Sequence, residues 1–346
     1  MMLRMGLVGA GRIGNLHAGN IARHPRMRIV AVHDVDSARA KALATKHGGR
    51  ATATLDELLG ADIDAVVIAS STNTHAAATL AAARAGKAIY LEKPIDLDFR
   101  EALRTADALR TAPVPIMVGF NRRYDAIYRA LRHEVRQGAL GRVQIVQMTS
   151  RGPNEAPTRE YIEHSGGIYR DKSIHFFDLL RFLVGREVVE ISVMGAALAD
   201  AFIGDLGDVD TCVMQLRLDD GAFCQIDNTR RAAYGFDERV EIFATGGLRV
   251  VGRVDSPIVR ADASGVLGAS FPHGFMQRFE DAFARAIDGF GRFILDGDSD
   301  VPTLADGIAA QAIAEAAALS AREGRMVEVA QVLRDVKPGP GPSTIR

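Results

Sequence analysis

The chain has 346 residues, which is long for a single hydrophobic core, so two domains are expected. Its hydrophobic content of 47% and charged content of 25% are ordinary for a soluble globular protein. The 42 basic and 43 acidic residues leave a net charge of -1, and no basic run is long enough for a nucleic-acid footprint. No apolar stretch reaches the length of a membrane span or a secretory signal. We therefore expect a cytoplasmic protein that binds neither nucleic acid nor a membrane.

The first 120 residues alternate between two kinds of segment. Short apolar runs rich in β-branched residues are typical of buried strands, and they cover residues 3–9, 28–34, 64–70, 87–93 and 115–120. Stretches rich in Ala, Leu and Arg are typical of helices, and they cover residues 36–47, 54–59, 73–85 and 98–110. Strict alternation of strand and helix predicts an α/β domain over residues 1–120, with a parallel sheet covered on both faces.

After residue 121 the pattern changes. Helices are predicted at 122–137, 274–295 and 303–322, and long runs typical of strands lie at 142–150, 187–198, 209–218, 222–230 and 238–251. The strands follow one another with turn signals between them, which predicts an open, mostly antiparallel sheet. Residues 121–330 therefore form an α+β domain, and the Pro- and Gly-rich tail within 331–346 need not form a packed element. Cys212 and Cys224, in adjacent predicted strands, are expected to be reduced core thiols.

A glycine motif follows the first strand. Gly9, Gly11 and Gly14 have G-x-G-x-x-G spacing, with Arg12 and Ile13 between the last two, and a predicted helix begins there. Such glycines permit a tight turn, a close approach of the backbone to a pyrophosphate and close packing of helix on strand. The helix N-terminus supplies N–H donors to the phosphates. A glycine-rich turn that binds nothing is the alternative, but strand and helix on either side favour a doubly wound Rossmann domain.

Asp34 ends the second predicted strand, 20 residues after Gly14. A carboxylate there can accept hydrogen bonds from both ribose hydroxyls and would repel a 2′-phosphate, which favours NAD over NADP. Arg39, one turn into the following helix, is expected to be a solvated charge rather than a phosphate ligand.

Polar residues follow the next strands at their carboxyl ends, where ligands of open α/β sheets bind. Ser70, Thr72, Asn73 and His75 are placed to meet the ribose and pyrophosphate, although Thr72 or Asn73 could cap a helix as well, and Thr74 is favoured as a cap. Glu92, Lys93 and Pro94 end the fifth strand run. Pro94 restricts Lys93 to an extended turn, which directs the ammonium toward the nicotinamide; a solvated surface charge is the alternative.

The segment "RDKSIHFFD", residues 170–178, places Asp171, His175 and Asp178 on one face of a predicted helix. Oxidation of a secondary alcohol by NAD needs a base for the hydroxyl proton, and histidine is suited to that task near neutral pH. Asp171, one turn earlier, could orient the ring and stabilise the imidazolium. A purely structural histidine is the alternative, and Asp178 is as well explained by an ion pair, for example with Arg181.

Five motifs in order now carry a resemblance: "GAGRIGNLHA", "ASSTNTH", "EKP", "GFNRRYD" and "GGIYRDKSIHFFDLLRF". Together they resemble the glucose–fructose oxidoreductase/inositol dehydrogenase/MocA family, and within it the myo-inositol 2-dehydrogenase-like enzymes. The resemblance implies NAD as the cofactor and a catalytic set in which His175 is the acid/base, Asp171 its partner and Lys93 the group that holds the reacting hydroxyl. It implies no metal.

The resemblance also implies substrate contacts and an assembly. Substrate contacts are expected from Asn121, Arg122, Asn154 and Tyr234 as well as the catalytic set; the alternatives are an ion pair of Arg122 with Asp125, a turn residue at 154 and an amphipathic lid at 234. Many inositol dehydrogenases carry Met at the position of Asn121 and an acid at that of Phe176. Dimers or tetramers are implied, built by packing the open sheets face to face.

The sequence therefore predicts an NAD-dependent dehydrogenase of a cyclic polyol, with myo-inositol oxidised to 2-keto-inositol as the leading reaction. Other inositol isomers and pyranose sugars remain alternative substrates. A nucleotide-binding regulator without turnover is the alternative from another class, because a fold does not fix a function. An NAD-assisted glycoside hydrolase is the third possibility. The predicted cofactor contacts are Gly9, Gly11, Arg12, Ile13, Gly14, Asp34, Ser70, Thr72, Asn73, His75, Glu92 and Lys93.

Overall fold

The computed structural model describes residues 1–153, 155–252, 260–262, 265–267 and 272–336. These residues form two compact units. The first contains residues 1–124 and 281–309, and the second contains the described residues of 125–280 and 310–336. The boundary drawn from the sequence assigned residues 281–309 to the second domain, whereas in the structure they group with the first unit.

The first unit is built on a six-stranded parallel sheet in the order β3-β2-β1-β4-β5-β6. The strands are β1 (Leu3–Val8), β2 (Met27–His33), β3 (Arg50–Thr52), β4 (Ala65–Ile68), β5 (Ala88–Leu91) and β6 (Ile116–Val118). The helices between them are α1 (Arg12–Arg23), α2 (Ser37–Lys46), α3 (Leu55–Leu59), α4 (His75–Arg84) and α5 (Phe99–Leu109). The strand order reverses between β1 and β4, which is where ligands of such sheets bind. The predicted α/β domain is confirmed, with the three-residue β3 as an additional edge strand.

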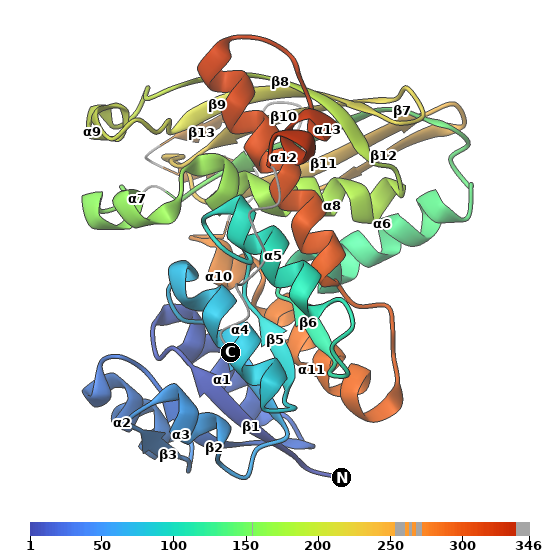
Figure 1. Ribbon diagram of the computed structural model, residues 1–346. Coiled ribbons are helices and arrows are strands. Elements are labelled where there is room, and N and C mark those ends of the chain that lie inside the picture. Colours follow the sequence, from blue (N-terminus) through green and yellow to red (C-terminus); the bar gives the residue numbers. More distant parts are fainter. Residues whose placement is uncertain (154, 253–259, 263–264, 268–271, 337–346) are drawn as a thin grey trace. The chain divides into compact units, whose positions relative to one another are not determined.

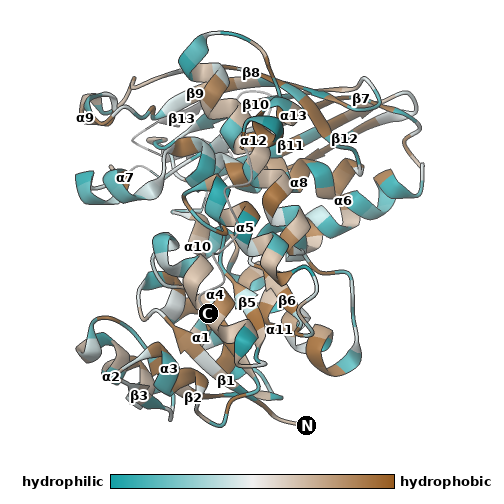
Figure 2. Ribbon diagram, viewed as in Figure 1, coloured by the Kyte–Doolittle hydropathy of each residue, from teal (hydrophilic) through white to brown (hydrophobic). Residues whose placement is uncertain are grey.

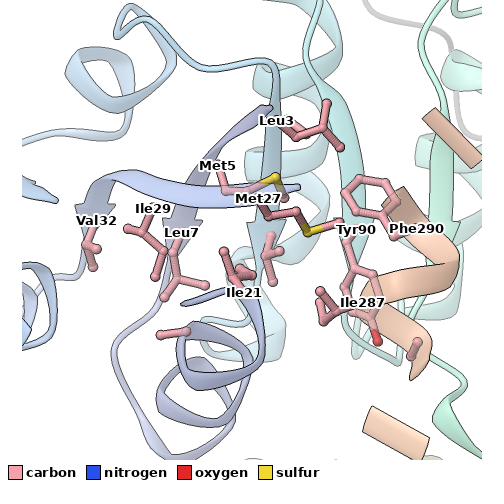
Figure 3. Packing of buried hydrophobic residues seen from close by; sticks show 14 of the residues in the cluster. Leu3, Met5, Leu7, Ile21, Met27, Ile29, Val32, Tyr90, Ile287 and Phe290 are labelled. Carbon is pink, nitrogen blue, oxygen red and sulfur yellow. The ribbon is translucent and has the colours of Figure 1, made fainter. Parts of the chain in front are cut away.

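The hydrophobic core of the first unit explains why residues 281–309 belong to it. All four residues of β4 and of β5 are buried, and the ribbons of β1 and β5 are largely brown in Figure 2. Helix α11 (Glu280–Asp296) adds Ile287 and Phe290 to the same cluster, beside Met5 and Tyr90 (Figure 3). The rings of Tyr90 and Phe290 lie 5.7 Å apart between centroids, in an edge-to-face arrangement. Helix α11, although it comes late in the sequence, therefore completes the core of the first unit.

The second unit is built on a seven-stranded sheet, most of whose strands are labelled in Figure 1. The strand order is β12-β11-β7-β10-β9-β8-β15. Its strands are β7 (Val143–Arg151), β8 (Val188–Ala196), β9 (Thr211–Leu218), β10 (Phe223–Thr229), β11 (Asp237–Ala244), β12 (Gly247–Val251) and β15 (Val327–Glu328). Every pair is antiparallel except β10 with β7, which is parallel. The expected open, mostly antiparallel sheet is confirmed. β13 (Arg260–Asp262) and β14 (Gly265–Leu267) form a separate pair.

Several predicted elements divide in the structure. The strand run 238–251 becomes β11 and β12, because Gly247 at φ 150° allows the hairpin turn. The helix at 122–137 becomes the 3₁₀ turn η2 (Asn121–Tyr124) and α6 (Ala126–Arg136), and Asp125 caps α6 by accepting from Ile127 N and Tyr128 N. The helix at 274–295 becomes α10 (Phe275–Arg278) and α11, while α12 (Leu304–Glu323) follows the prediction. The remaining helices are α7 (Arg159–Ser165), α8 (Ile174–Val184), α9 (Ala201–Asp205) and α13 (Val329–Asp335).

The two faces of the second sheet differ. One face is covered by helices: Tyr128 on α6 donates to Glu238 on β11 at 3.0 Å, and Val193 N of β8 donates to Ser320 of α12 at 3.0 Å. Strand alternation turns the opposite residues away from these helices. In β9 and β10, for example, Val213 and Phe223 are 45% and 52% exposed, next to buried cysteines. The open face is therefore partly apolar.

The cysteines are core residues, as expected. Cys212 and Cys224 are both free and buried, and burial raises the pKa of Cys212 to about 12. Among the described helices none is both long and apolar enough to cross a membrane.

Candidate active site

The glycine loop is shaped by contacts that only glycine permits. Gly9 has φ 98°, and a Cβ on it would lie 2.5 Å from the carbonyl oxygen of Ala69. A Cβ on Gly14 would overlap the carbonyl oxygen of Gly9. A Cβ on Gly11, in contrast, would have nothing within 4 Å among the described residues. The first glycine thus permits the tight turn, and the third permits close packing of the helix on the strand. The second leaves open space beside the loop for a phosphate.

The N-terminus of α1 is suited to an anion. Gly11 is its N-cap, no side chain of the described residues caps it, and its first turn holds no acidic residue. The backbone N–H groups and the positive end of the helix dipole are therefore available to a pyrophosphate. Arg12 and Ile13, two predicted cofactor contacts, are the first residues of this helix.

Asp34 lies beside the same loop. Its Oδ2 accepts a hydrogen bond from Ala10 N at 2.6 Å, and its Oδ1 accepts one from Asp36 N at 2.8 Å. These bonds fix the carboxylate between the glycine turn and α2, where the sequence predicted a ribose contact. The next residue, Val35, is 97% exposed. The residues present fit NAD. Arg39 pairs with Asp36 at 3.1 Å on the surface, as expected for a solvated charge.

In the loop after β4, the helix cap expected from the sequence does not form through a side chain. Thr72, Asn73 and Thr74 form the 3₁₀ turn η1 (Thr72–Thr74), and Thr74 is the N-cap of α4 without a side-chain capping bond. The Thr74 hydroxyl instead donates to Ser71 O at 2.7 Å and lies 2.6 Å from Ser70 Oγ. The prediction that Thr74 caps the helix through its side chain is therefore wrong, because the 3₁₀ turn directs its hydroxyl backward. Ser70, Thr72 and Asn73 stay predicted cofactor contacts.

His75 and Glu92 are buried next to Lys93. His75 is 1% exposed, with Nδ1 2.8 Å from Pro94 O and Nε2 3.1 Å from Ser70 O. Burial lowers the pKa of His75, and its hydrogen bonds to the backbone at Pro94 and Ser70 offset part of that shift. Glu92 Oε1 lies 2.7 Å from His17 Nε2 in α1, and its Oε2 accepts from Lys93 N at 3.3 Å. These contacts tie the segment around Lys93 to α1 and to the loop after β4. His75 and Glu92 stay predicted cofactor contacts.

Asn121 and Arg122 lie on η2, which follows β6 in the first unit. Arg123, the next residue, forms an ion pair with Asp306 at 2.9 Å. Burial raises the pKa of Asp306 and Arg123 lowers it, to about 2 in sum. Asn121 is 1% exposed, and neither atom of its amide has a hydrogen-bond partner among the described residues. A buried amide with this property is suited to a polar ligand.

Asp171 and His175 lie in the second unit on a helix that changes type. Residues 169–173 form the π-helical turn η3 (Tyr169–Ser173), and α8 follows directly from Ile174. The prediction of one regular α-helix through residues 170–178 is therefore wrong at its start. Turns of this kind occur often at functional sites, because they re-aim a side chain relative to the regular helix. The entry uses Gly166 and Gly167, at φ 77° and 88°.

Among the described residues, Tyr161 and Arg230 both donate to the carboxylate of Asp171. Tyr161 of α7 donates its hydroxyl to Oδ2 at 2.6 Å, and the guanidinium of Arg230 lies 3.0 Å from the same oxygen. Both contacts favour the ionised form of Asp171. Neither partner was predicted from the sequence; the only local signal was that Arg230 lies at the end of a predicted strand.

The end of β10 anchors η3 residue by residue. Asn228 donates to Ser173 Oγ at 2.7 Å. The ammonium of Lys172 donates to the carbonyl oxygen of Thr229, and also to Ser150 O at 3.3 Å. Arg230, next along the chain, pairs with Asp171. The last two residues of β10 and the residue that follows it thus hold three consecutive residues of the turn, in reverse order.

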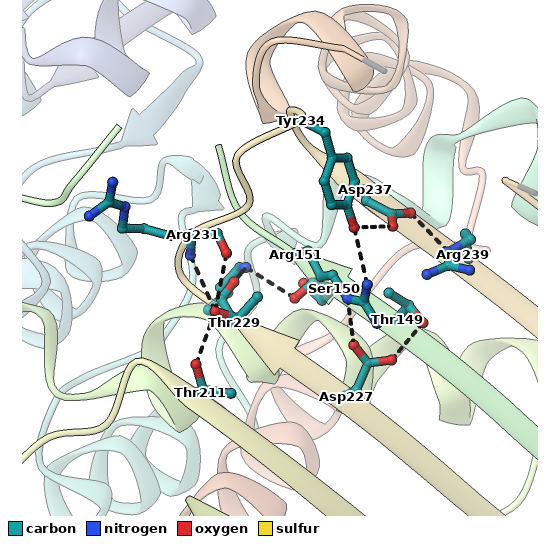
Figure 4. Close-up of polar contacts among 11 residues, drawn as sticks. Thr149, Ser150, Arg151, Thr211, Asp227, Thr229, Arg231, Tyr234, Asp237 and Arg239 are labelled. Carbon is teal, nitrogen blue, oxygen red and sulfur yellow. Dashed lines mark hydrogen bonds and ion pairs between the residues drawn. The ribbon is translucent and has the colours of Figure 1, made fainter. Parts of the chain in front are cut away.

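The remaining predicted residues differ in their surroundings. The hydroxyl of Tyr234 donates to Asp237 Oδ2 at 2.8 Å and lies 3.1 Å from Arg151 Nη1 in a polar network (Figure 4). Asp178 is fully buried, and Arg181, its suggested partner, forms a two-bond pair with Glu187 at 2.7 and 2.8 Å. Asp125 pairs with Arg278 at 2.6 Å. Asn154 lies outside the described residues.

The geometry of the first unit is that of a Rossmann domain of a dinucleotide-dependent oxidoreductase, and comparison with known families agrees. Residues 3–120 match the oxidoreductase family with an NAD-binding Rossmann fold called GFO_IDH_MocA, and residues 128–249 match the GFO/IDH/MocA C-terminal domain. The chain belongs to the GFO/IDH/MocA family, as the motifs predicted, and it is an NAD-dependent oxidoreductase.

Individual relatives cover nearly the whole chain. An inositol 2-dehydrogenase of Rhizobium meliloti is 41% identical over 95% of this chain and 100% of its own length. A myo-inositol 2-dehydrogenase of Thermotoga maritima is 35% identical over 96% of this chain and 100% of its own. The crystal structure of scyllo-inositol dehydrogenase from Lactobacillus casei, with bound NAD(H) and scyllo-inositol, is 28% identical, with a TM-score of 0.87 over 95% of this chain and 100% of that one.

Replacing Asp34 should narrow the preference for NAD. In Asp34→Ser the carboxylate that would oppose a 2′-phosphate is gone, so the ratio of NADPH to NADH dissociation constants should fall by about tenfold or more. Binding of each reduced cofactor is measured by its fluorescence. Asp36→Asn is the matched control, because an amide oxygen can still accept from Ala38 N and Arg39 N at the start of α2. Wild-type protein that bound NADPH more tightly than NADH would contradict the role of Asp34.

Proposed function

We propose that this protein is an NAD-dependent dehydrogenase that oxidises a secondary hydroxyl of a cyclic polyol, with myo-inositol converted to 2-keto-inositol as the leading reaction. The observation that carries the chemistry is the carboxylate of Asp171, which is held by Tyr161 and Arg230 four residues before His175. The names of the relatives support the substrate class. A non-catalytic regulator would not need a carboxylate held in this way one helical turn before a histidine.

Each proposed role follows from the chemistry of the side chain. His175 accepts the hydroxyl proton, since a neutral imidazole is the base best suited to this pH range. Asp171 stabilises the resulting imidazolium and orients the ring. Lys93, which follows β5 in the first unit, holds the reacting oxygen with its ammonium. NAD, when bound, accepts the hydride; the residues of the chain orient the substrate and move the proton.

The substrate contacts are proposed from Asn121 and Arg122, with Asn154 and Tyr234 retained from the resemblance. Asn121 supports a hydroxylated ligand, because both its amide oxygen and its amide nitrogen lack partners among the described residues. An amide here, rather than an apolar side chain, can both accept from and donate to ring hydroxyls. Other inositol isomers and pyranose sugars stay alternatives, and one structural relative is named for scyllo-inositol.

NADH formation against a panel of polyols tests the proposal. With NAD⁺ present, myo-inositol should give the highest kcat/KM, with scyllo-inositol, chiro-inositol and glucose lower. A free polyol should produce NADH stoichiometrically, which an NAD-assisted glycoside hydrolase would not do. Absence of NADH with every member of the panel, despite tight cofactor binding, would favour the regulator instead.

His175→Ala should lower kcat by about 10²–10⁴-fold, the range expected for a positioned acid/base, with NADH affinity little changed. In wild type the base must be neutral to act, so kcat/KM should rise with pH through a group in the histidine range. The measurement is the pH–rate curve of the variant beside that of wild type. Near-wild-type turnover with the same pH dependence would show that the proton goes elsewhere.

We also propose a cytoplasmic homo-oligomer, a dimer or tetramer formed through the open face of the second sheet. A row of exposed apolar side chains crosses four neighbouring strands there, in register: Leu248 opposite Phe243, Phe243 opposite Ile145, and Ile145 opposite Phe223. Each of the four is 40–52% exposed. Burial of such a row against the same row of a second copy would stabilise an isologous contact.

Phe223→Glu combined with Phe243→Glu should reduce the mass measured in solution by size exclusion with light scattering. Two carboxylates buried in the contact would be strongly unfavourable. Leu333→Glu on α13 is the control, because this side chain is similarly exposed at 44% but lies outside the row. A double variant with the wild-type mass would contradict this interface.

A further inference from the structure

Arg230 is a buried cation at a strand end. Its side chain is 5% exposed, and its backbone N–H donates to Asp210 O at 2.8 Å, which fixes where the side chain starts. A guanidinium removed from water is unfavourable unless carboxylates compensate it. Its neighbour Arg231, by contrast, is 33% exposed and pairs with Asp200 at 2.9 Å.

The two ends of the guanidinium bind two different carboxylates. Nη1 contacts Asp171 at 3.0 Å, and Nη2 contacts Asp208 at 3.1 Å. Burial lowers the pKa of Arg230, while these carboxylates raise it, and the sum is a rise. A planar fork can hold two carboxylates in a fixed arrangement, whereas an ammonium acts as a point charge.

Asp208 in turn fixes the entry to η3. Its Oδ1 accepts from Ile168 N at 3.0 Å, and a Cβ on Gly167 would lie 3.3 Å from the same oxygen. Through Asp208, Arg230 thereby connects the backbone of Ile168, where the turn begins, to the side chain of Asp171. Tyr161 completes the arrangement from α7 by donating to Asp171.

We infer that Arg230, with Asp208 and Tyr161, positions Asp171 for its work with His175 and sets the charge that His175 experiences. The inference rests on the proposed function, in which Asp171 stabilises the imidazolium. Among the described residues, the charged and titratable groups around the cluster include Asp171, Asp208 and Tyr161, with Lys172, Cys212, Asp227 and Tyr169 nearby. Arg230 offsets part of the negative charge of Asp171, so its removal should leave the imidazolium better stabilised.

The test is the pH profile of kcat/KM in the full-length protein with myo-inositol and NAD⁺, for Arg230→Met, Arg230→Lys and Tyr161→Phe. Arg230→Met should lower kcat by about 10–10²-fold and move the ascending limb to higher pH by up to about one unit, the scale of a single lost neighbouring charge. Arg230→Lys should restore the pH position of the ascending limb, because the positive charge is present again. It should restore only part of kcat, because an ammonium cannot hold both carboxylates as the planar guanidinium does. Tyr161→Phe should move the limb in the same direction by less.

Arg231→Met is the matched control and should keep the wild-type profile, since its ion pair lies with Asp200. NADH binding and the circular dichroism spectrum report whether each variant is folded. If Arg230→Met does not fold, Tyr161→Phe decides, because that ring is 43% exposed and its hydroxyl is removable without a cavity. An unshifted limb in the folded variants, with turnover lost in Asp171→Asn, would overturn the positioning role alone. Wild-type turnover in Asp171→Asn would overturn the proposed function instead.

Discussion

A guanidinium enclosed between two carboxylates is the constraint on which the second unit of this protein depends. Arg230 has almost no exposure to water, and Asp171 and Asp208 lie on either side of it. Buried ion pairs of this kind contribute little net stability compared with apolar packing, but removing one partner costs about 3–5 kcal/mol, because a charge is left buried and uncompensated. The arrangement therefore has one strongly favoured geometry, which is what a catalytic carboxylate requires.

The sheet supplies the rigidity behind this geometry. Asn228 and Thr229 end β10, which pairs on both sides, with β9 and with β7, so two ladders of hydrogen bonds fix their positions. Arg230 directly follows the strand, and its backbone N–H donates to Asp210 O at 2.8 Å. Each of the three then contacts one residue of η3. A site supported by strand ends keeps its side chains in place better than one on free loops. The π-helical turn is held in a conformation that an isolated helix would not choose.

The sequence predicted the parts of the site that depend on local spacing. The glycine turn and the place of Asp34 beside it are each defined within a few residues of a strand end, so pattern and turn chemistry were sufficient for their geometry. The role of Lys93 stays a prediction. The partners of Asp171 were not predictable, because Tyr161 and Arg230 are 10 and 59 residues away and meet it only through the tertiary fold. The π-helical turn was missed for the same reason: its stabilising contacts with β10 have no signature in the helical period. Similarly, the apolar face of α11 indicated a helix, but not that Ile287 and Phe290 complete the core of the first unit.

The proposed reaction is tested most directly by following the hydrogen that leaves the substrate. Myo-inositol that carries deuterium in place of hydrogen on C2 is incubated with the protein and NAD⁺, and the NADH formed is examined by mass spectrometry. If the protein oxidises the C2 hydroxyl, the NADH carries one deuterium and its formation is slower than with unlabelled substrate whenever hydride transfer limits the rate. NADH formed without deuterium would place the oxidation at another carbon, and an absence of NADH would contradict the proposed activity on myo-inositol.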